Sequence, residues 1–208
     1  MADFDQALKL KPEDPVSLIG RGELYLASRD LGHAKTDFDA ALRADPNRMP
    51  QVAAFYVATG NFEPAIAGYD AWIEAHPKSD NLYAAFNARC RARTMWNHDL
   101  DKALADCEAA MHRGPRAAAL FETRGLTHLR RGELDLALAD YNEALKLQPR
   151  LAWALYGRGL AKIGKGDKAG GEADLQAAAT IAPNLAAQAK RFGLAPPGAT
   201  VQAAAAGG

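Results

Sequence analysis

A short glycine- and lysine-rich segment holds the residues whose spacing best fits a known chemistry. Gly159-x4-Gly164-Lys165 matches the start of a phosphate-binding loop, and Gly164-x-Gly166-x2-Ala169 matches a dinucleotide-binding fingerprint. A phosphate-binding loop needs Ser or Thr after its lysine to hold magnesium, but Gly166 stands there. Both motifs also follow a β-strand, whereas the residues before Gly164 have a helical pattern. We therefore expect these glycines to serve packing and turns, and we expect no cofactor.

Cysteine and histidine, the residue types that most often bind zinc in proteins, occur in one region of the chain as Cys90, His98, Cys107 and His112. A zinc site made from these four residues would lack the usual close cysteine pairs, so we expect no metal site. Free cysteine behaves as a small buried apolar residue, which is our leading interpretation of both cysteines. A disulfide needs Cα atoms within about 7 Å of each other, and the sequence leaves this alternative open.

Residues for covalent or acid–base catalysis do not form a recognisable set. The sequence contains neither G-x-S-x-G nor H-E-x-x-H, and its 5 histidines are scattered along the chain. We therefore expect no catalytic residues and no enzyme activity, since an enzyme would need a separate catalytic domain.

Arginine and aspartate recur together at a fixed distance. Arg21, Arg124 and Arg158 lie 16 residues before Asp37, Asp140 and Asp174. In addition, Asp3, Asp106 and Asp140 lie 18 residues before the same three arginines. We predict repeated ion pairs between a first and a second helix; the alternative is anion binding by exposed arginines.

The composition indicates which elements position these residues. Of the 208 residues, 46 are alanine, and valine and isoleucine together supply only 9. This balance favours closely packed helices over β-sheet, which prefers β-branched residues. Basic and acidic side chains number 25 each, so the net charge is 0 and nucleic acid is not an expected partner.

Apolar residues are dispersed along the chain. No run of about 18 apolar residues is present, so we expect no transmembrane helix and no membrane partner. The first residues alternate charged and apolar side chains, unlike a signal peptide. We expect a cytoplasmic protein, with the periplasm or secretion as the alternative if an N-terminal segment has been removed.

Prolines reveal an internal repeat. Six of them lie 34, 31, 38, 34 and 34 residues apart: Pro12, Pro46, Pro77, Pro115, Pro149 and Pro183. Upstream of each proline, small and aromatic residues recur at constant offsets, and three repeats share a glycine slot: Gly22, Gly125 and Gly159. We predict that these glycines allow a neighbouring helix to approach closely, and that each proline ends a second helix.

These slots resemble the tetratricopeptide repeat, W-x2-L-G-x2-Y…A-x3-F…P, over residues 1 to about 183. The sequence departs from the pattern at Ala53 and Asn87, which stand in the glycine slot, and through four extra residues near 95–99. The resemblance implies an all-α fold, a right-handed α-solenoid of helical hairpins with about five repeats. An N-terminal half repeat would precede them and a polar capping helix at 184–192 would follow.

The 3.6-residue period and the breakers divide the chain into predicted helices. They span residues 2–11, 15–28, 31–44, 49–59, 62–76, 79–95, 99–113, 116–131, 134–148, 150–165, 168–181 and 184–192. We predict one solenoid domain over 1–193 and a flexible Ala/Pro/Gly tail over 194–208. The helix at 2–11 matches a second helix without its first, so we suspect a fragment or a misplaced start.

The resemblance implies a protein-interaction scaffold whose first helices line a groove for a peptide or a partner helix. The residues that would line it are Ile19, Glu23, Leu26, Asn81, Ala84, Arg91, Glu122, Leu126, Leu129, Trp153, Tyr156 and Leu160. The family's clamp for a C-terminal carboxylate uses Lys, Asn and Arg, and Ile19 and Glu23 replace that pattern here. We therefore predict a mainly apolar peptide, anchored near Trp153 and Tyr156, unless the helix at 184–192 buries that stripe.

A structural role is the alternative function. Without a partner helix before it, the helix at 2–11 leaves Leu10 uncovered, and terminal repeats without a polar cap tend to associate. The alternative predicts a homo-oligomer formed through the N-terminal end.

Overall fold

The computed structural model describes residues 1–196. Contacts divide the chain into two compact units, Met1–His98 and a second unit that begins at Asp99. Within residues 1–196 the regular elements are α-helices and one short 3₁₀ turn, without a β-strand, which confirms the all-α prediction. The single domain predicted over 1–193 stays a prediction, and 197–208, most of the predicted tail, lie outside the described residues.

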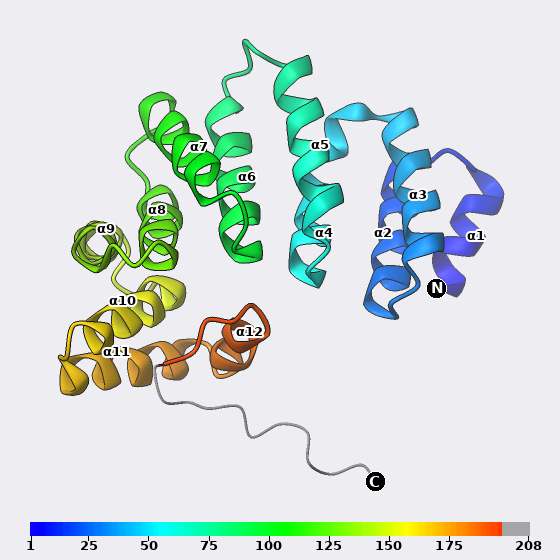
Figure 1. Cartoon of the computed structure of the whole chain (residues 1–208). Helices are drawn as coiled ribbons and strands as arrows, with labels where there is room; N and C mark the ends of the chain where they lie inside the picture. Colours follow the sequence, from blue (N-terminus) through cyan, green and yellow to red (C-terminus); the bar gives the residue numbers. More distant parts are fainter. Residues whose placement is uncertain (197–208) are drawn as a thin grey trace, which may run out of the picture. The chain divides into compact units, whose positions relative to one another are not determined.

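The first unit contains two complete helical hairpins (Figure 1). Its elements are α1 (Ala2–Leu10), α2 (Pro15–Ala27), α3 (Leu31–Ala44), η1 (Pro46–Arg48), α4 (Met49–Thr59), α5 (Phe62–Ala75) and α6 (Leu82–Trp96). Helix α2 packs against α1 and α3, and α5 packs against α4 and α6. Phe38 and Tyr56 meet edge to face in the core, with their ring centroids 5.3 Å apart.

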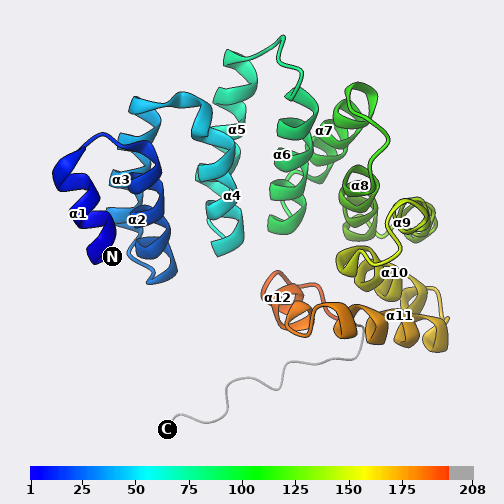
Figure 2. The same ribbon diagram turned by 180° about the vertical axis from the view of Figure 1, so that it is seen from behind.

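The second unit repeats this arrangement. Its helices are α7 (Leu100–Arg113), α8 (Ala118–Arg130), α9 (Leu134–Leu147), α10 (Ala152–Gly164), α11 (Lys168–Ile181) and α12 (Leu185–Arg191). Helices α8 and α9 form one hairpin, α10 and α11 form the next, and α10 also packs against α8 (Figure 2). Helix α12 packs against α10 and α11, as expected of a capping helix.

Local sequence signals explain where these helices begin and end. The carboxylates of Asp14, Asp30 and Asp167 accept a hydrogen bond from a backbone N–H in the first turn of α2, α3 and α11, respectively. The repeat prolines follow the second helices within two residues, because proline cannot continue the helical hydrogen bonds. Each predicted helix agrees with an observed one to within three residues at both ends.

The glycine slot is confirmed as a point of close approach. A Cβ atom on Gly22 would lie 2.6 Å from the Phe38 ring of α3. On Gly159 it would lie 2.9 Å from the backbone oxygen of Gly171 in α11. Both distances are too short for real Cβ contacts, so a larger residue would push the first helix away from the second.

Candidate functional site

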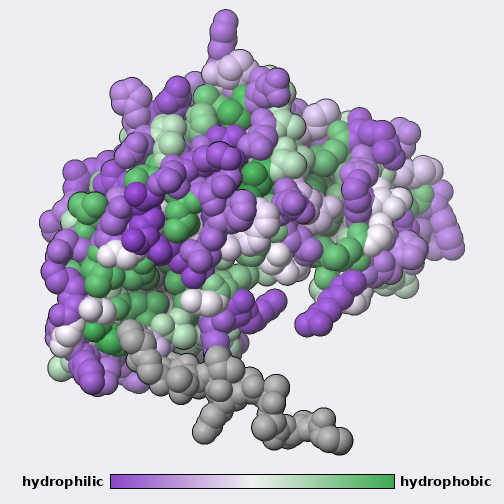
Figure 3. Space-filling model, viewed as in Figure 1, coloured by the Kyte–Doolittle hydropathy of each residue, from purple (hydrophilic) through white to green (hydrophobic). Residues whose placement is uncertain are grey.

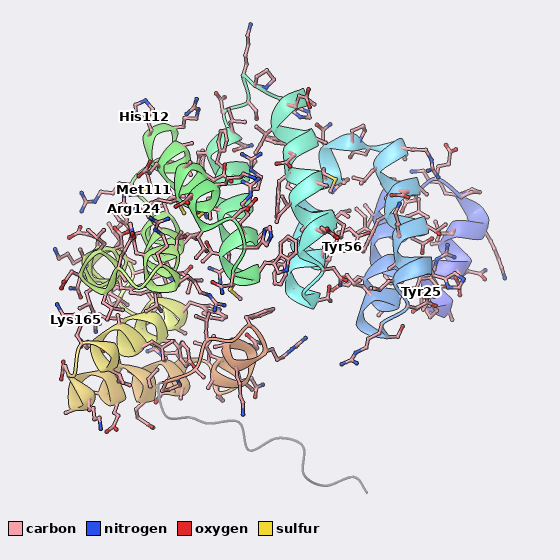
Figure 4. The ribbon with its side chains drawn as sticks, in the orientation of Figure 1. Tyr25, Tyr56, Met111, His112, Arg124 and Lys165 are labelled. Atoms are coloured by element: carbon pink, nitrogen blue, oxygen red, sulfur yellow. The ribbon has the colours of Figure 1, made fainter. Side chains whose placement is uncertain are left out.

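The repeated arginines bind the buried carboxylates of their own hairpins. Arg21 Nε and Nη2 on α2 each donate to a carboxylate oxygen of Asp37 on α3 at 2.8 Å. Arg124 binds Asp140 in the same bidentate way at 2.8 and 2.6 Å, and Arg124 is labelled on α8 in Figure 4. The structural interpretation of these arginines is therefore confirmed.

Arg158 on α10 and Asp174 on α11 form the third of these pairs, with both hydrogen bonds at 2.7 Å. Lys162 approaches the same carboxylate at 2.9 Å. Burial raises the pKa of Asp174, but the hydrogen bonds from Arg158 and Lys162 outweigh this effect and hold the pKa below its ordinary value. The carboxylate thus stays charged inside the hairpin.

The predicted partners 18 residues before each arginine are wrong for Arg21 and Arg158. Arg21 Nη1 donates to Asp5 at 2.9 Å rather than to Asp3, because two residues along a helix differ by about 200° in direction. Arg158 Nη1 donates to Asn142 at 3.0 Å rather than to Asp140, which lies two residues earlier on the same helix and binds Arg124. The observed spacing to the preceding repeat is therefore 16 residues in both cases.

The glycine-rich segment has the structural role that the sequence predicted. Gly164 is the last residue of α10, and the turn that follows it contains Gly166. Lys165, labelled in Figure 4, forms an ion pair with Asp135 at the start of α9. The segment follows a helix rather than a strand, so the features of a phosphate-binding loop are missing.

Cys90 and Cys107 are both buried, in α6 and α7. Neither is a free thiol, so the interpretation of both cysteines as free apolar residues is wrong. Within residues 1–196, no group of three metal-binding side chains is placed to hold an ion.

The predicted groove residues of the first unit differ in accessibility. Ile19 and Leu26 on α2 are buried in the hydrophobic core. Glu23 on the same helix is exposed, and so are Asn81 and Ala84 at the start of α6. Arg91 on α6 is half-buried.

In the second unit, most of the predicted groove residues are buried. Leu126 and the carboxylate-bearing Glu122 on α8 are buried, as are Tyr156 and Leu160 on α10. Leu129 and Trp153 are half-buried and expose part of their apolar side chains. The structure also brings the Trp153 and Tyr156 rings together edge to face, with centroids 6.3 Å apart.

Side chains of α8 and α10 hold a segment of the chain's own backbone. Arg130 Nη2 donates to the carbonyl oxygen of Phe192, and Arg130 Nη1 donates to that of Gly193 at 3.4 Å. The Tyr156 hydroxyl donates to the carbonyl oxygen of Leu194 at 3.1 Å. Three consecutive carbonyls therefore accept hydrogen bonds from these two side chains.

Arg130 was not identified from the sequence as a residue that binds this backbone segment. It lies four residues after Leu126 on α8, so the helical period places both residues on one face. Burial raises the pKa of Tyr156 and thereby favours the neutral hydroxyl, the form that can donate a hydrogen bond. We call Leu129, Arg130, Trp153 and Tyr156 the α8–α10 surface.

The face of the molecule seen in Figure 3 is mainly polar. Figure 3 shows hydrophilic side chains over most of one face, with hydrophobic side chains in small groups among them. Among the described helices, none has both the length and the apolar composition needed to cross a lipid bilayer.

Two models of the tetratricopeptide repeat match the chain. One, described as a tetratricopeptide repeat, matches residues 17–48, which span the α2–α3 hairpin. The other, described as a TPR repeat, matches residues 125–166 in the second unit. No curated protein sequence is significantly similar to the chain.

Solved structures with the same fold cover most of the chain. A tetratricopeptide repeat protein from Parabacteroides merdae ATCC 43184 is 19% identical, with a TM-score of 0.70, over 92% of this chain and 74% of its own. TTC0263, a thermophilic TPR protein from Thermus thermophilus, is 22% identical, with a TM-score of 0.64, over 86% and 97%. YrrB, described as a TPR protein with an unusual peptide-binding site, is 21% identical, with a TM-score of 0.53, over 90% and 97%.

These structures share the fold at low sequence identity, and the two repeat models match the hairpins in which the glycine and proline slots recur. The chain therefore contains tetratricopeptide repeats at residues 17–48 and 125–166 and has the fold of tetratricopeptide repeat proteins.

Proposed function

We propose that this chain is a protein-interaction scaffold that binds a peptide on the α8–α10 surface. The observation that carries the proposal is the set of hydrogen bonds from Arg130 and Tyr156 to consecutive backbone carbonyls. Carbonyls belong to every peptide, so these donors would hold a peptide backbone in place whatever its side chains. Specificity would then come from the apolar parts of Leu129 and Trp153.

The chemistry of this surface predicts how binding responds to salt. Arg130 supplies its cationic group, while Tyr156 donates as a neutral hydroxyl. Carbonyl acceptors are uncharged, so the contacts depend little on long-range attraction, which salt screens. We therefore expect the affinity to fall only slightly with ionic strength.

The fold supports the same class of function. YrrB is described as having a peptide-binding site, and it shares this fold over 90% of the present chain. We propose no catalytic activity, because the residues that recur in the repeat pattern serve helix packing, helix ends and ion pairs within the hairpins.

Selection from a phage-displayed library of random peptides on the full chain tests the proposal. We expect enriched peptides that slow amide hydrogen exchange in α8 and α10 when they bind. A library that yields no enriched peptide, or enriched peptides that protect only other helices, would contradict the proposal.

Self-association through the N-terminal end is a second candidate. Leu10, the last residue of α1, is 82% exposed, and the nearby Val16 is 59% exposed. If this apolar surface binds a second copy, light scattering after size exclusion should show a concentration-dependent dimer that Leu10→Lys removes. Leu147→Lys, at another exposed leucine, should leave the dimer intact. A strictly monomeric wild type at high concentration rules this candidate out.

A further inference from the structure

We infer that Phe192-Gly193-Leu194 is a resident occupant of the α8–α10 surface, and that a partner peptide must displace it. This inference rests on the proposed function and specifies it. The partner would be a peptide that forms a similar turn and carries a leucine-sized apolar side chain, because the resident segment has both features. We call residues 192–194 the resident segment.

The end of α12 directs the resident segment back toward α8 and α10. Gly193 has a φ of 69°, in the left-handed region that favours glycine. The Leu194 N–H donates to Ala189 O at 2.9 Å, and the Gly193 N–H donates to Lys190 O at 3.0 Å. This pair of hydrogen bonds defines a Schellman motif, which ends a helix and reverses the chain direction.

The contacts of the resident segment reach far along the sequence. Its carbonyl oxygens accept hydrogen bonds from Arg130, 62 and 63 residues earlier, and from Tyr156, 38 residues earlier. Leu194 is only 5% exposed, although it lies outside any helix. Leu194 therefore serves as the apolar anchor of the segment, while its backbone supplies the polar contacts.

Capping of α11 does not require these contacts. Leu185 and Ala189 are buried residues of α12 itself, which packs against α10 and α11. The hydrogen bonds from Arg130 and Tyr156 are made beyond the end of α12, to the resident segment. Helix α12 can therefore cover the end of the repeats whether or not the resident segment stays in place.

Occupancy by a tethered segment weakens the binding of an external peptide. A segment attached through a short connection is present at a millimolar effective concentration. The apparent affinity for an external peptide equals the intrinsic affinity multiplied by the fraction of molecules in which the surface is open. A substitution that releases the resident segment should therefore tighten the binding of a peptide with the same sequence.

Gly193 offers a substitution that acts on the turn alone. A Cβ atom there would meet only Arg130 Nη1, at 3.8 Å, which is an ordinary contact. Gly193→Val would therefore act through its left-handed backbone, which disfavours a β-branched residue. Gly193→Asn is the matched control, because asparagine tolerates this conformation.

The experiment uses the full chain and a fluorescein-labelled peptide with the sequence of residues 191–196. We expect Gly193→Val to bind this peptide about tenfold more tightly than the wild type in fluorescence anisotropy, and Gly193→Asn to bind it like the wild type. A peptide with alanine in place of leucine should bind neither variant. Thermal melting of the variants verifies that each remains folded.

Hydrogen exchange on the same variants measures release without any peptide. We expect the Leu194 amide to exchange about tenfold faster in Gly193→Val than in the wild type. Equal peptide affinity or equal exchange in Gly193→Val and the wild type would overturn the inference that residues 192–194 occupy the α8–α10 surface. Peptides selected from the library could in that case still bind α8 and α10. Failure of that selection would instead overturn the proposed function.

Discussion

Glycine at the Gly125 position sets how closely the first and second helices of a hairpin can pack. A Cβ atom on Gly125 would lie 3.2 Å from the ring of Tyr141, which is fully buried. The ring is held by the core on its other sides, so it has little room to move away.

Gly125→Leu should therefore destabilise the protein by about 1–3 kcal/mol, because the added side chain overpacks the contact between α8 and α9. Urea denaturation measures the change. Gly32→Ala is the control, since Gly32 lies in α3 and the nearest atom to an added Cβ is 3.8 Å away. We expect its stability to lie within about 1 kcal/mol of the wild type. Equal stability of Gly125→Leu and the wild type would refute the packing role.

Burial of the Tyr69 side chain should make the protein less stable at high pH. Burial raises the pKa of Tyr69 to about 12. Between about pH 10 and about pH 12 the Tyr69 hydroxyl therefore keeps its proton in the folded state but loses it in the unfolded state. The contribution of Tyr69 to stability is complete below about pH 10 and disappears toward about pH 12. The loss amounts to about 2–3 kcal/mol.

Tyr69→Phe should remove this part of the alkaline loss, because phenylalanine has no proton to release. Urea denaturation of both proteins from about pH 8 to about pH 12 provides the measurement. The difference in stability between them should shift in favour of Tyr69→Phe as the pH rises. Parallel pH profiles would contradict the prediction.

At the scale of the elements, the buried ion pairs connect the two helices of each hairpin. Asp174 is 9% exposed in its side chain and receives both Arg158 and Lys162. Removing one partner leaves a charge that is only partly compensated in a buried position. The Arg158–Asp174 ion pair should therefore contribute more to the free energy of unfolding than an ion pair on the surface does.

Arg158→Met should lower the free energy of unfolding by about 1.5–3 kcal/mol. Adding Asp174→Asn should recover part of this loss, since the uncompensated charge is then gone. Lys35→Ala is the control: its pair with Asp39 is exposed, at 69% and 45%, and should contribute less than about 0.5 kcal/mol. A similar loss for Lys35→Ala and Arg158→Met would contradict this assignment.

Local signals made the helices predictable, because they act over a few residues. The proline slots gave the ends of the second helices, and Asp30 and Asp167 begin helices that were placed correctly. The Arg–Asp spacing of 16 likewise reported the hairpin geometry. The predicted pairing of Asp3 with Arg21 was wrong, because the pattern gives a spacing but does not show which side of the helix faces Arg21.

The α8–α10 surface was only partly predictable. Trp153 and Tyr156 follow from the helical period, but their neighbours depend on where the chain goes after Gly193. Gly193 indicates the end of a helix, and from the sequence we predicted that a flexible tail follows it over 194–208. The reversal toward Arg130 depends on contacts more than 60 residues apart, which no local pattern contains.

At the scale of the whole molecule, the interaction surface proposed here belongs to the second unit. The first unit offers Trp96, 37% exposed, which stacks on Phe62 at 6.2 Å and serves as a matched tryptophan outside that surface. Truncating either tryptophan removes the same atoms. Binding should respond only to the one on α10.

Calorimetric titration of a library-selected peptide into Trp153→Ala and into Trp96→Ala tests directly which tryptophan contributes to binding. We predict that the affinity per folded molecule of Trp153→Ala falls about 30-fold, or about 2 kcal/mol, relative to the wild type. Trp96→Ala should bind the peptide like the wild type. Unchanged affinity per folded molecule of Trp153→Ala would contradict peptide binding on the α8–α10 surface.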